Sequence, residues 1–228
     1  MKSTRLLSAL SLAAGMFAVL PAAHAVTFTE LGDAGQSVAS AQNTAGSAGS
    51  LTNIFGSLAS TSDADLYLIN ITDAAGFSAN TVNAVTGDLD TMLFLFTMGG
   101  APVYLNDDAP IGTTVGSQLQ AGNAFGPLVA GTYVLGVSFS GVEPVNAVNQ
   151  YLFANGTLNT DTRGPAFGLQ PAVLSGFEGD GFGPPGAYDI QLTGVGAVPE
   201  PATSLMLLAG AFGVLGATRR ARRARLGA

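Results

Sequence analysis

Residues 91–97 read Thr-Met-Leu-Phe-Leu-Phe-Thr, an uncharged run with five consecutive apolar side chains. A short apolar run of this kind, bounded by turn residues, is typical of a strand in a protein core. Gly99-Gly100 follow the run, and Val103-Tyr-Leu105 form a second strand-like segment directly afterwards. The arrangement predicts two neighbouring strands at the centre of a β-structured body.

Segments with strand character extend to both sides of this pair. Five further segments are rich in strand formers: 65–71, 132–139, 151–153, 157–158 and 187–193. Asn155-Gly156, between the third and the fourth, is a type I′ hairpin signal. Gly, Asn, Asp and Pro separate the segments, as in sandwiches and barrels. We expect the main apolar core to be formed by Leu93, Phe94, Leu95, Phe96, Val134, Leu135, Val137 and Phe139.

Two regions fit this pattern less well. Residues 33–62 are rich in Ala, Gly, Ser and Thr, which suits a lead-in strand or a flexible segment. Residues 141–186 are rich in Gly and Pro and predict a long insert carrying one hairpin. We therefore divide the chain into a lead-in at 26–62 and a β-domain at 63–197.

The first 25 residues have the layout of a secretory signal peptide. Lys2 and Arg5 precede a short apolar helix, and Ala23 and Ala25 form a small-x-small cleavage site. The alternative is an N-terminal membrane anchor, for which the apolar run is short. We expect signal peptidase to cut after Ala25, so that the mature chain begins near Val26.

The last 31 residues, 198–228, have a second targeting layout. Val198-Pro199-Glu200-Pro201 precede an uncharged, mostly apolar stretch at 202–217, which predicts a short transmembrane helix. The tail at 218–228 contains five arginines, which act as a stop-transfer signal and stay cytoplasmic: Arg219, Arg220, Arg222, Arg223 and Arg225.

This order of motif, apolar span and arginine cluster resembles the PEP-CTERM sorting signal of Gram-negative bacteria. The resemblance implies transient anchoring in the inner membrane and processing by an exosortase. It further implies release to the cell surface or to the extracellular polysaccharide matrix. The alternative is a plain single-pass anchor in which Pro-Glu-Pro occurs by chance.

The body that remains after processing, residues 26–197, is strongly acidic. It contains fourteen Asp and Glu residues and a single base, Arg163, for a formal charge of −13. Such a surface repels nucleic acid, so we expect no nucleic-acid partner. The body contains no Cys, His, Lys or Trp. Disulfides and zinc sites of the His/Cys type are therefore excluded, and stability must come from the apolar core.

Short motifs in the body resemble the bacterial pre-peptidase C-terminal domain. They are Asp63-Ala-Asp-Leu-Tyr67, Asp90-Thr-Met-Leu-Phe-Leu95, Asn106-Asp-Asp108 and Ala130-Gly-Thr-Tyr133. The resemblance implies a jelly-roll-like antiparallel β-sandwich of about eight strands. It also implies a non-catalytic accessory module that binds matrix or polysaccharide, in some members with calcium.

Three functions remain open on the sequence. The first is a non-enzymatic surface or matrix protein, and the second is a carbohydrate-binding module of the exopolysaccharide. The third is a carboxylate-dependent hydrolase, since two carboxylates suffice for a glycosidase. Because the body offers no His, Cys or Lys as base or nucleophile, we expect no enzyme.

A calcium site is the one cofactor that the spacing suggests. Asp88 and Asp90 precede the strand at 91–97, and Asn106, Asp107 and Asp108 follow its neighbour. In an antiparallel pair these two ends meet, which brings carboxylate and amide oxygens together. The alternative is that the same residues only form turns, because Asp and Asn side chains bond the nearby backbone.

Overall fold

The structure is a computed structural model, and it describes residues 24–44, 49–81, 89–109, 115–154, 162–169, 172–181 and 183–196. The predicted signal helix, the Val198–Pro201 motif, the C-terminal apolar helix and the arginine tail lie outside these residues, as does Asp88. Among the described residues, no helix is long and apolar enough to cross a membrane.

The body is built from strands. In chain order they are β1 (Ala25–Thr29), β2 (Gln42–Asn43), β3 (Ser50–Leu58), β4 (Ala64–Ile71), β5 (Ser78–Asn80), β6 (Thr91–Thr97), β7 (Pro102–Asn106), β8 (Gln118–Leu119), β9 (Gly131–Phe139), β10 (Glu143–Val145), β11 (Thr162–Arg163), β12 (Gly176–Glu178), β13 (Gly186–Thr193) and β14 (Val195–Gly196). The described part of the chain contains no helix, which confirms the all-β class.

Twelve of these strands form one curled sheet in the order β11-β7-β6-β9-β4-β14-β3-β13-β5-β8, with β1 beside β3 and β2 beside β4. Those two added strands pair in parallel, and the other pairs are antiparallel. The segment before β8 returns to the beginning of β6, where the Thr91 amide donates to the Val115 carbonyl at 3.1 Å. The sheet is therefore nearly barrel-shaped, and the finer jelly-roll assignment stays a prediction.

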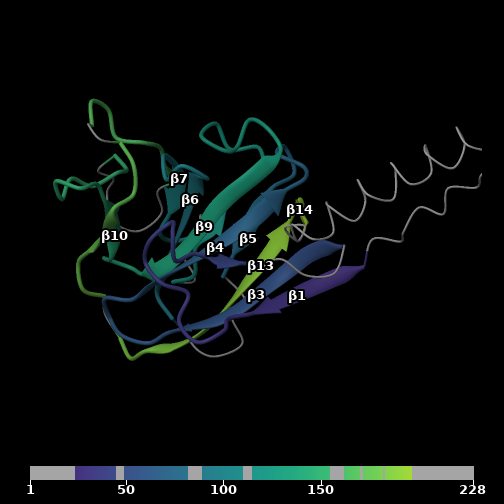
Figure 1. Ribbon diagram of the computed structural model, residues 1–228, viewed down its shortest axis with the longest axis horizontal. Coiled ribbons are helices and arrows are strands. Elements are labelled where there is room, and N and C mark those ends of the chain that lie inside the picture. The colour runs from purple at the N-terminus through teal and green to yellow at the C-terminus, as the bar shows by residue number, and fades with distance from the viewer. Residues whose placement is uncertain are drawn as a thin grey trace, which may run out of the picture.

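The centre of the sheet is formed by strands that the sequence predicted. β9 pairs with β4 on one side, with Tyr67 opposite Leu135, and with β6 on the other, with Leu95 opposite Leu135. β4 and β9 run side by side through the middle of Figure 1. All eight predicted core residues are fully buried, which confirms that part of the prediction.

The inside of the curled sheet holds the larger of two apolar cores. Alternate residues of the central strands point inward and meet residues of β3 and β13 from the opposite wall. Ile54, Tyr67, Leu95, Leu135 and Ile190 are representative members, each with no exposed surface. The large buried aliphatic and aromatic surface supplies the stability that disulfides cannot supply here.

A second apolar core lies on the outer face of β6, and the Gly- and Pro-rich insert covers it. Phe94 and Phe96 point to this face, where they meet Leu152, Phe153 and Phe177 from the insert. Phe153 lies 6.1 Å from the Phe94 ring and 5.7 Å from the Phe96 ring. The described part of the insert adds β10 and β12, which form a small sheet of their own. The predicted Asn155-Gly156 hairpin lies outside the described residues.

The segment 26–62 contributes strands to the same sheet. β3 pairs with β13 over six positions, from Leu58 opposite Gly186 to Asn53 opposite Gln191. β1 extends the edge of β3 and begins at Ala25, the predicted cleavage position. The segment that the composition presented as a lead-in thus closes one wall of the inner core.

Candidate functional site

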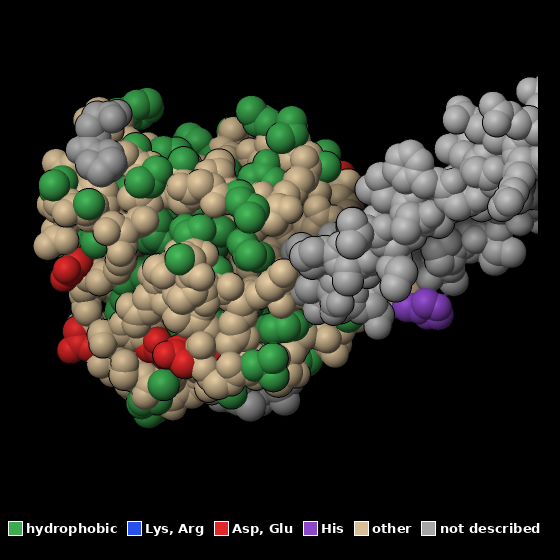
Figure 2. Space-filling view, viewed as in Figure 1, with side chains coloured by type: hydrophobic (Ala, Val, Ile, Leu, Met, Phe, Trp, Pro, Cys, Tyr) green, Lys and Arg blue, Asp and Glu red, His purple; other side chains and the backbone are tan. Residues whose placement is uncertain are grey.

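Carboxylates gather at one end of the curled sheet, where β4 and β6 begin and β7 and β9 end. On the face shown in Figure 2 most of the visible acidic side chains lie at the lower left of the body, and no Lys or Arg side chain is visible there. The described residues at this end form two separate groups of three carboxylates. In each group, one oxygen of every residue lies within 4.8 Å of the others.

The first group joins Asp90, directly before β6, to Asp107 and Asp108, directly after β7. The antiparallel pairing of β6 with β7, in which Leu93 lies opposite Asn106, brings these two strand ends together. The structure therefore places three of the five predicted ligands in one cluster. Whether the cluster holds calcium stays a prediction.

Asp107 is the buried member of this group. Its side chain is 3% exposed, and its Oδ1 has no hydrogen-bond partner among the described residues. Burial raises the pKa of Asp107 to about 6, against a lowering by a hydrogen bond from Ser140. Burial also raises the pKa of Asp90, and repulsion from Asp108 adds to that rise. A cation here would offset both the desolvation and the repulsion.

Asn106, the fourth described residue of the predicted set, ties β7 to two other strands. Its Oδ1 accepts the Gln118 amide at 2.6 Å, and its Nδ2 donates to the Thr162 hydroxyl at 3.4 Å. The side chain thus connects β7 to β8 and β11, and its role as a calcium ligand stays a prediction.

Ser117, which was not predicted from the sequence, supports the cluster. Its hydroxyl donates to the carbonyls of Thr91 and Asp107, one from each of the two strand ends. Its amide donates to the Thr81 hydroxyl at 2.9 Å. Ser117 is fully buried, so these bonds hold the two strand ends in register. A lone serine in a polar loop carries no local signal for such a role.

Arg163 lies close enough to influence the first group. Its guanidinium forms an ion pair with Glu143 at 3.2 Å, and its positive charge lowers the pKa of Asp107 slightly. It is the only base in residues 26–197. Because the Arg163 guanidinium already pairs with Glu143, it does not neutralise the three carboxylates of the first group, which keep an excess of negative charge.

We expect calcium to raise the melting temperature of the protein through this cluster. A cation that binds only the folded state at a hundred times its Kd adds about 2.7 kcal/mol, or a rise of roughly 5–10 °C for a chain of this size. Magnesium should do less, because it requires a tighter octahedral cage. Thermal melts in calcium, in magnesium and in chelator check this. Asp108→Asn should reduce the rise, and Asp73→Asn, in an exposed turn, should keep it; three superimposed wild-type curves would contradict the site.

The second group joins Glu30 and Asp33, which follow β1, to Asp65 on β4. Asp65 faces the inner core with no exposed surface, and its Oδ2 accepts the Tyr188 hydroxyl at 2.6 Å. Tyr188 is in turn hydrogen-bonded to Tyr67. Burial raises the pKa of Asp65 to about 8, so without a counter-charge its carboxyl is largely protonated at neutral pH.

This second group was not predicted from the sequence. Asp65 and Tyr67 were noted only as part of a strand motif, and Glu30 and Asp33 lie some thirty residues earlier. Gly56, in the middle of β3, is a sequence feature that could have indicated a close approach of other groups to this strand. A Cβ there would lie 2.3 Å from the Tyr188 hydroxyl and 2.7 Å from Glu30 Oε2, so only glycine lets these groups approach.

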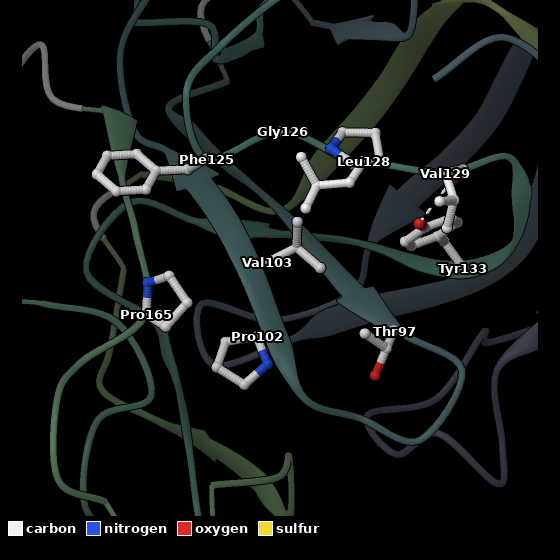
Figure 3. A pocket seen from close by; sticks show the side chains of 10 residues that line it. Thr97, Pro102, Val103, Phe125, Gly126, Leu128, Val129, Tyr133 and Pro165 are labelled. Atoms are coloured by element: carbon white, nitrogen blue, oxygen red, sulfur yellow. Dashed lines mark hydrogen bonds between the residues drawn. The ribbon is translucent and has the colours of Figure 1, made fainter. Parts of the chain in front are cut away.

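The body also has a shallow apolar hollow of about 320 Å³ over β7 and the start of β9. Phe125, Pro102 and Pro165 line one side of it, and Leu128 points toward Val103 in its middle (Figure 3). The Tyr133 hydroxyl is occupied, since it donates to the Val129 carbonyl at 2.9 Å. The described residues that line the hollow include no carboxylate and no base.

The β-body and the targeting tail together define an exported, core-stabilised β-protein with a C-terminal sorting signal. Residues 197–223 match the model of the PEP-CTERM protein-sorting motif. This match implies an exported protein that is anchored transiently in the membrane and recognised by an exosortase. No curated protein and no solved structure matches the chain.

Proposed function

We propose that this chain is a non-enzymatic surface or matrix protein, delivered by signal peptidase and exosortase to the outside of a Gram-negative cell. The match of residues 197–223 to the PEP-CTERM motif is the observation that carries the proposal. The body ahead of the motif has two well-formed cores of its own, so it can stay folded after the tail is removed. Its final place is the cell surface or the exopolysaccharide matrix.

The geometry of the acidic groups supports a role other than catalysis. In each group one oxygen of every residue lies within 4.8 Å of the others, a spacing at which three carboxylates can share one cation. Asp65 and Asp107 are also buried, which leaves no room for a sugar beside them. Clusters of this kind suit a cation better than a scissile bond, so the hydrolase alternative gains no support.

A carbohydrate-binding module is the second candidate. With it we propose the finer fold assignment, a jelly roll like that of the pre-peptidase C-terminal domain. Sugar sites combine an aromatic platform with several polar groups that bond the hydroxyls. The apolar hollow has Phe125 at its rim, and both hydroxyls of its described lining already form hydrogen bonds: Thr97 accepts the Ala101 amide, and Tyr133 donates to the Val129 carbonyl. This lining favours the structural role over sugar binding.

The sorting motif is tested by replacing Pro199, Glu200 and Pro201 with alanine in the native host. The variant should stay in the inner membrane, because the exosortase no longer recognises it. The wild-type protein should be released, with an intact mass that begins near Val26 and lacks the arginine tail. Cell fractionation and mass spectrometry measure both.

The matched control replaces Pro184 and Pro185, two exposed prolines of the body, with alanine. This variant should be released like the wild type, because it keeps the motif. Release of the Pro199-Glu200-Pro201 variant at the wild-type level, or recovery of a stable surface species that ends at Ala228, would overturn the proposal.

A further inference from the structure

Asp65 Oδ1 is a buried carboxylate oxygen without a partner. The Asp65 side chain has no exposed surface, and its other oxygen is occupied by the Tyr188 hydroxyl. No protein group among the described residues donates to Oδ1. Buried polar atoms in folded proteins are almost always satisfied, so an atom of this kind indicates a missing ligand.

The neighbours of Asp65 are two more carboxylates. One oxygen each of Glu30, Asp33 and Asp65 lies within 4.8 Å of the others. Three carboxylates in such proximity repel each other. Burial raises the pKa values of Glu30 and Asp65 above their ordinary range, and repulsion from neighbouring carboxylates, Asp33 among them, adds to both rises. None of the charged groups that act on Asp65 is a cation.

We propose that Glu30, Asp33 and Asp65 form a binding site for a divalent cation, with calcium as the best fit. All three ligands are hard oxygen donors, and no His or Cys is present in the mature body to favour zinc. Two calcium–oxygen bonds on opposite sides of the ion span about 4.6–5.2 Å, so oxygens that lie within 4.8 Å of one another can share one calcium ion. Magnesium fits less well, because it requires a near-ideal octahedral shell.

The surrounding structure holds the three ligands in place. Glu30 Oε1 accepts the Ala34 amide at 3.0 Å, and Oε2 accepts the Ser57 amide at 2.8 Å. Asp33 Oδ1 accepts the Gly35 amide at 3.3 Å. Each of these oxygens retains a second lone pair for a cation. The site is thus formed by a turn after β1 and by the buried start of β4.

The cation would fasten the segment after β1 onto the central sheet. Glu30 and Asp33 belong to that segment, Asp65 belongs to β4, and Tyr188 connects Asp65 to β13. One ion therefore ties three regions that are far apart in the sequence. This site is separate from the one at Asp90, Asp107 and Asp108, and it does not depend on the sorting function.

Equilibrium dialysis of the purified full-length chain against radioactive calcium tests the proposal. Calcium in the range of 10⁻⁴–10⁻³ M, typical of extracellular modules, should load the site. Asp33→Asn should lose one bound ion per chain or bind it at least tenfold more weakly. Asp33 is exposed, so this variant should keep the fold and the circular dichroism spectrum of the wild type.

Two control variants separate this site from other acidic residues. Asp73→Asn changes an exposed aspartate that bonds the Gly76 amide in a similar turn, and it should bind calcium like the wild type. Asp108→Asn changes only the first group and should retain the ion that Asp33→Asn loses. A wild-type chain without bound calcium, or equal binding by Asp33→Asn and Asp73→Asn, would overturn the proposal.

Discussion

Replacing Phe94 with alanine is expected to destabilise the body by about 3–5 kcal/mol, enough to unfold a domain of marginal stability. Phe94 lies in the middle of β6 with no exposed surface. Its ring packs 5.8 Å from Phe177 and 6.1 Å from Phe153, so alanine leaves a cavity between the sheet and the insert. Phe96→Ala should have a similar effect, because the buried Phe96 ring packs against Phe94 and Phe153.

Thermal and denaturant unfolding, followed by circular dichroism, measure the effect. A loss of this size corresponds to a melting temperature lower by roughly 6–20 °C. Met98→Ala is the matched control, because Met98 follows the same strand and is 55% exposed. Its melting temperature should stay close to the wild type. Unchanged melting of both phenylalanine variants would show that β6 is not the centre of the core.

Replacing Phe153 with alanine is expected to cost nearly as much, although Phe153 lies in the Gly- and Pro-rich insert. It is 1% exposed and contacts the rings of both Phe94 and Phe96. Its removal leaves a cavity in the same outer core, on the side of the insert, so we expect the free energy of unfolding to fall by about 3–5 kcal/mol. The insert would then be a structural cover rather than a loose loop.

Phe167 provides the control for this variant. It belongs to the same insert but is 99% exposed, so Phe167→Ala should leave the melting temperature unchanged. Denaturant unfolding of both variants measures the difference. Equal stability of Phe153→Ala and Phe167→Ala would mean that the insert does not stabilise the sheet.

These two phenylalanines also separate what local sequence can predict from what it cannot. Phe94 belongs to a run whose composition alone indicates a buried strand, and the structure confirms it. Phe153 ends the strand-like segment 151–153, which is too short for a period to show which of its residues is buried. Its burial follows from the outer face of β6, which is apolar and must be covered by some other part of the chain.

The strand β3 illustrates the same limit. Its buried residues Leu51, Ile54 and Leu58 do not alternate, and Thr, Asn, Gly and Ser separate them. Local preference therefore gave a weak signal, and the strand is fixed by its pairing with β13 and β1. The long separation between these partners in the sequence hides the pairing from any local pattern.

Of the two acidic groups, one could be predicted from the sequence and the other could not. The sequence predicted that Asp90, Asp107 and Asp108 meet, because a hairpin of adjacent strands brings its two ends together. It did not predict the hydrogen bonds of Asn106 to Gln118 and Thr162, since these depend on the placement of β8 and β11. The group of Glu30, Asp33 and Asp65 was invisible, because it requires β1, β3 and β4 to be placed first.

By itself the sequence determined the all-β class, the central strands β4, β6 and β9, and the sorting signal near the C-terminus. Each of these depends on neighbouring residues: a local apolar pattern, or a linear motif that another protein recognises. Only the tertiary structure decided how the sheet curls, which segments cover its two faces, and which carboxylates become buried together. These features depend on contacts between residues far apart in the chain, and the free energy of such contacts is not encoded in any single segment.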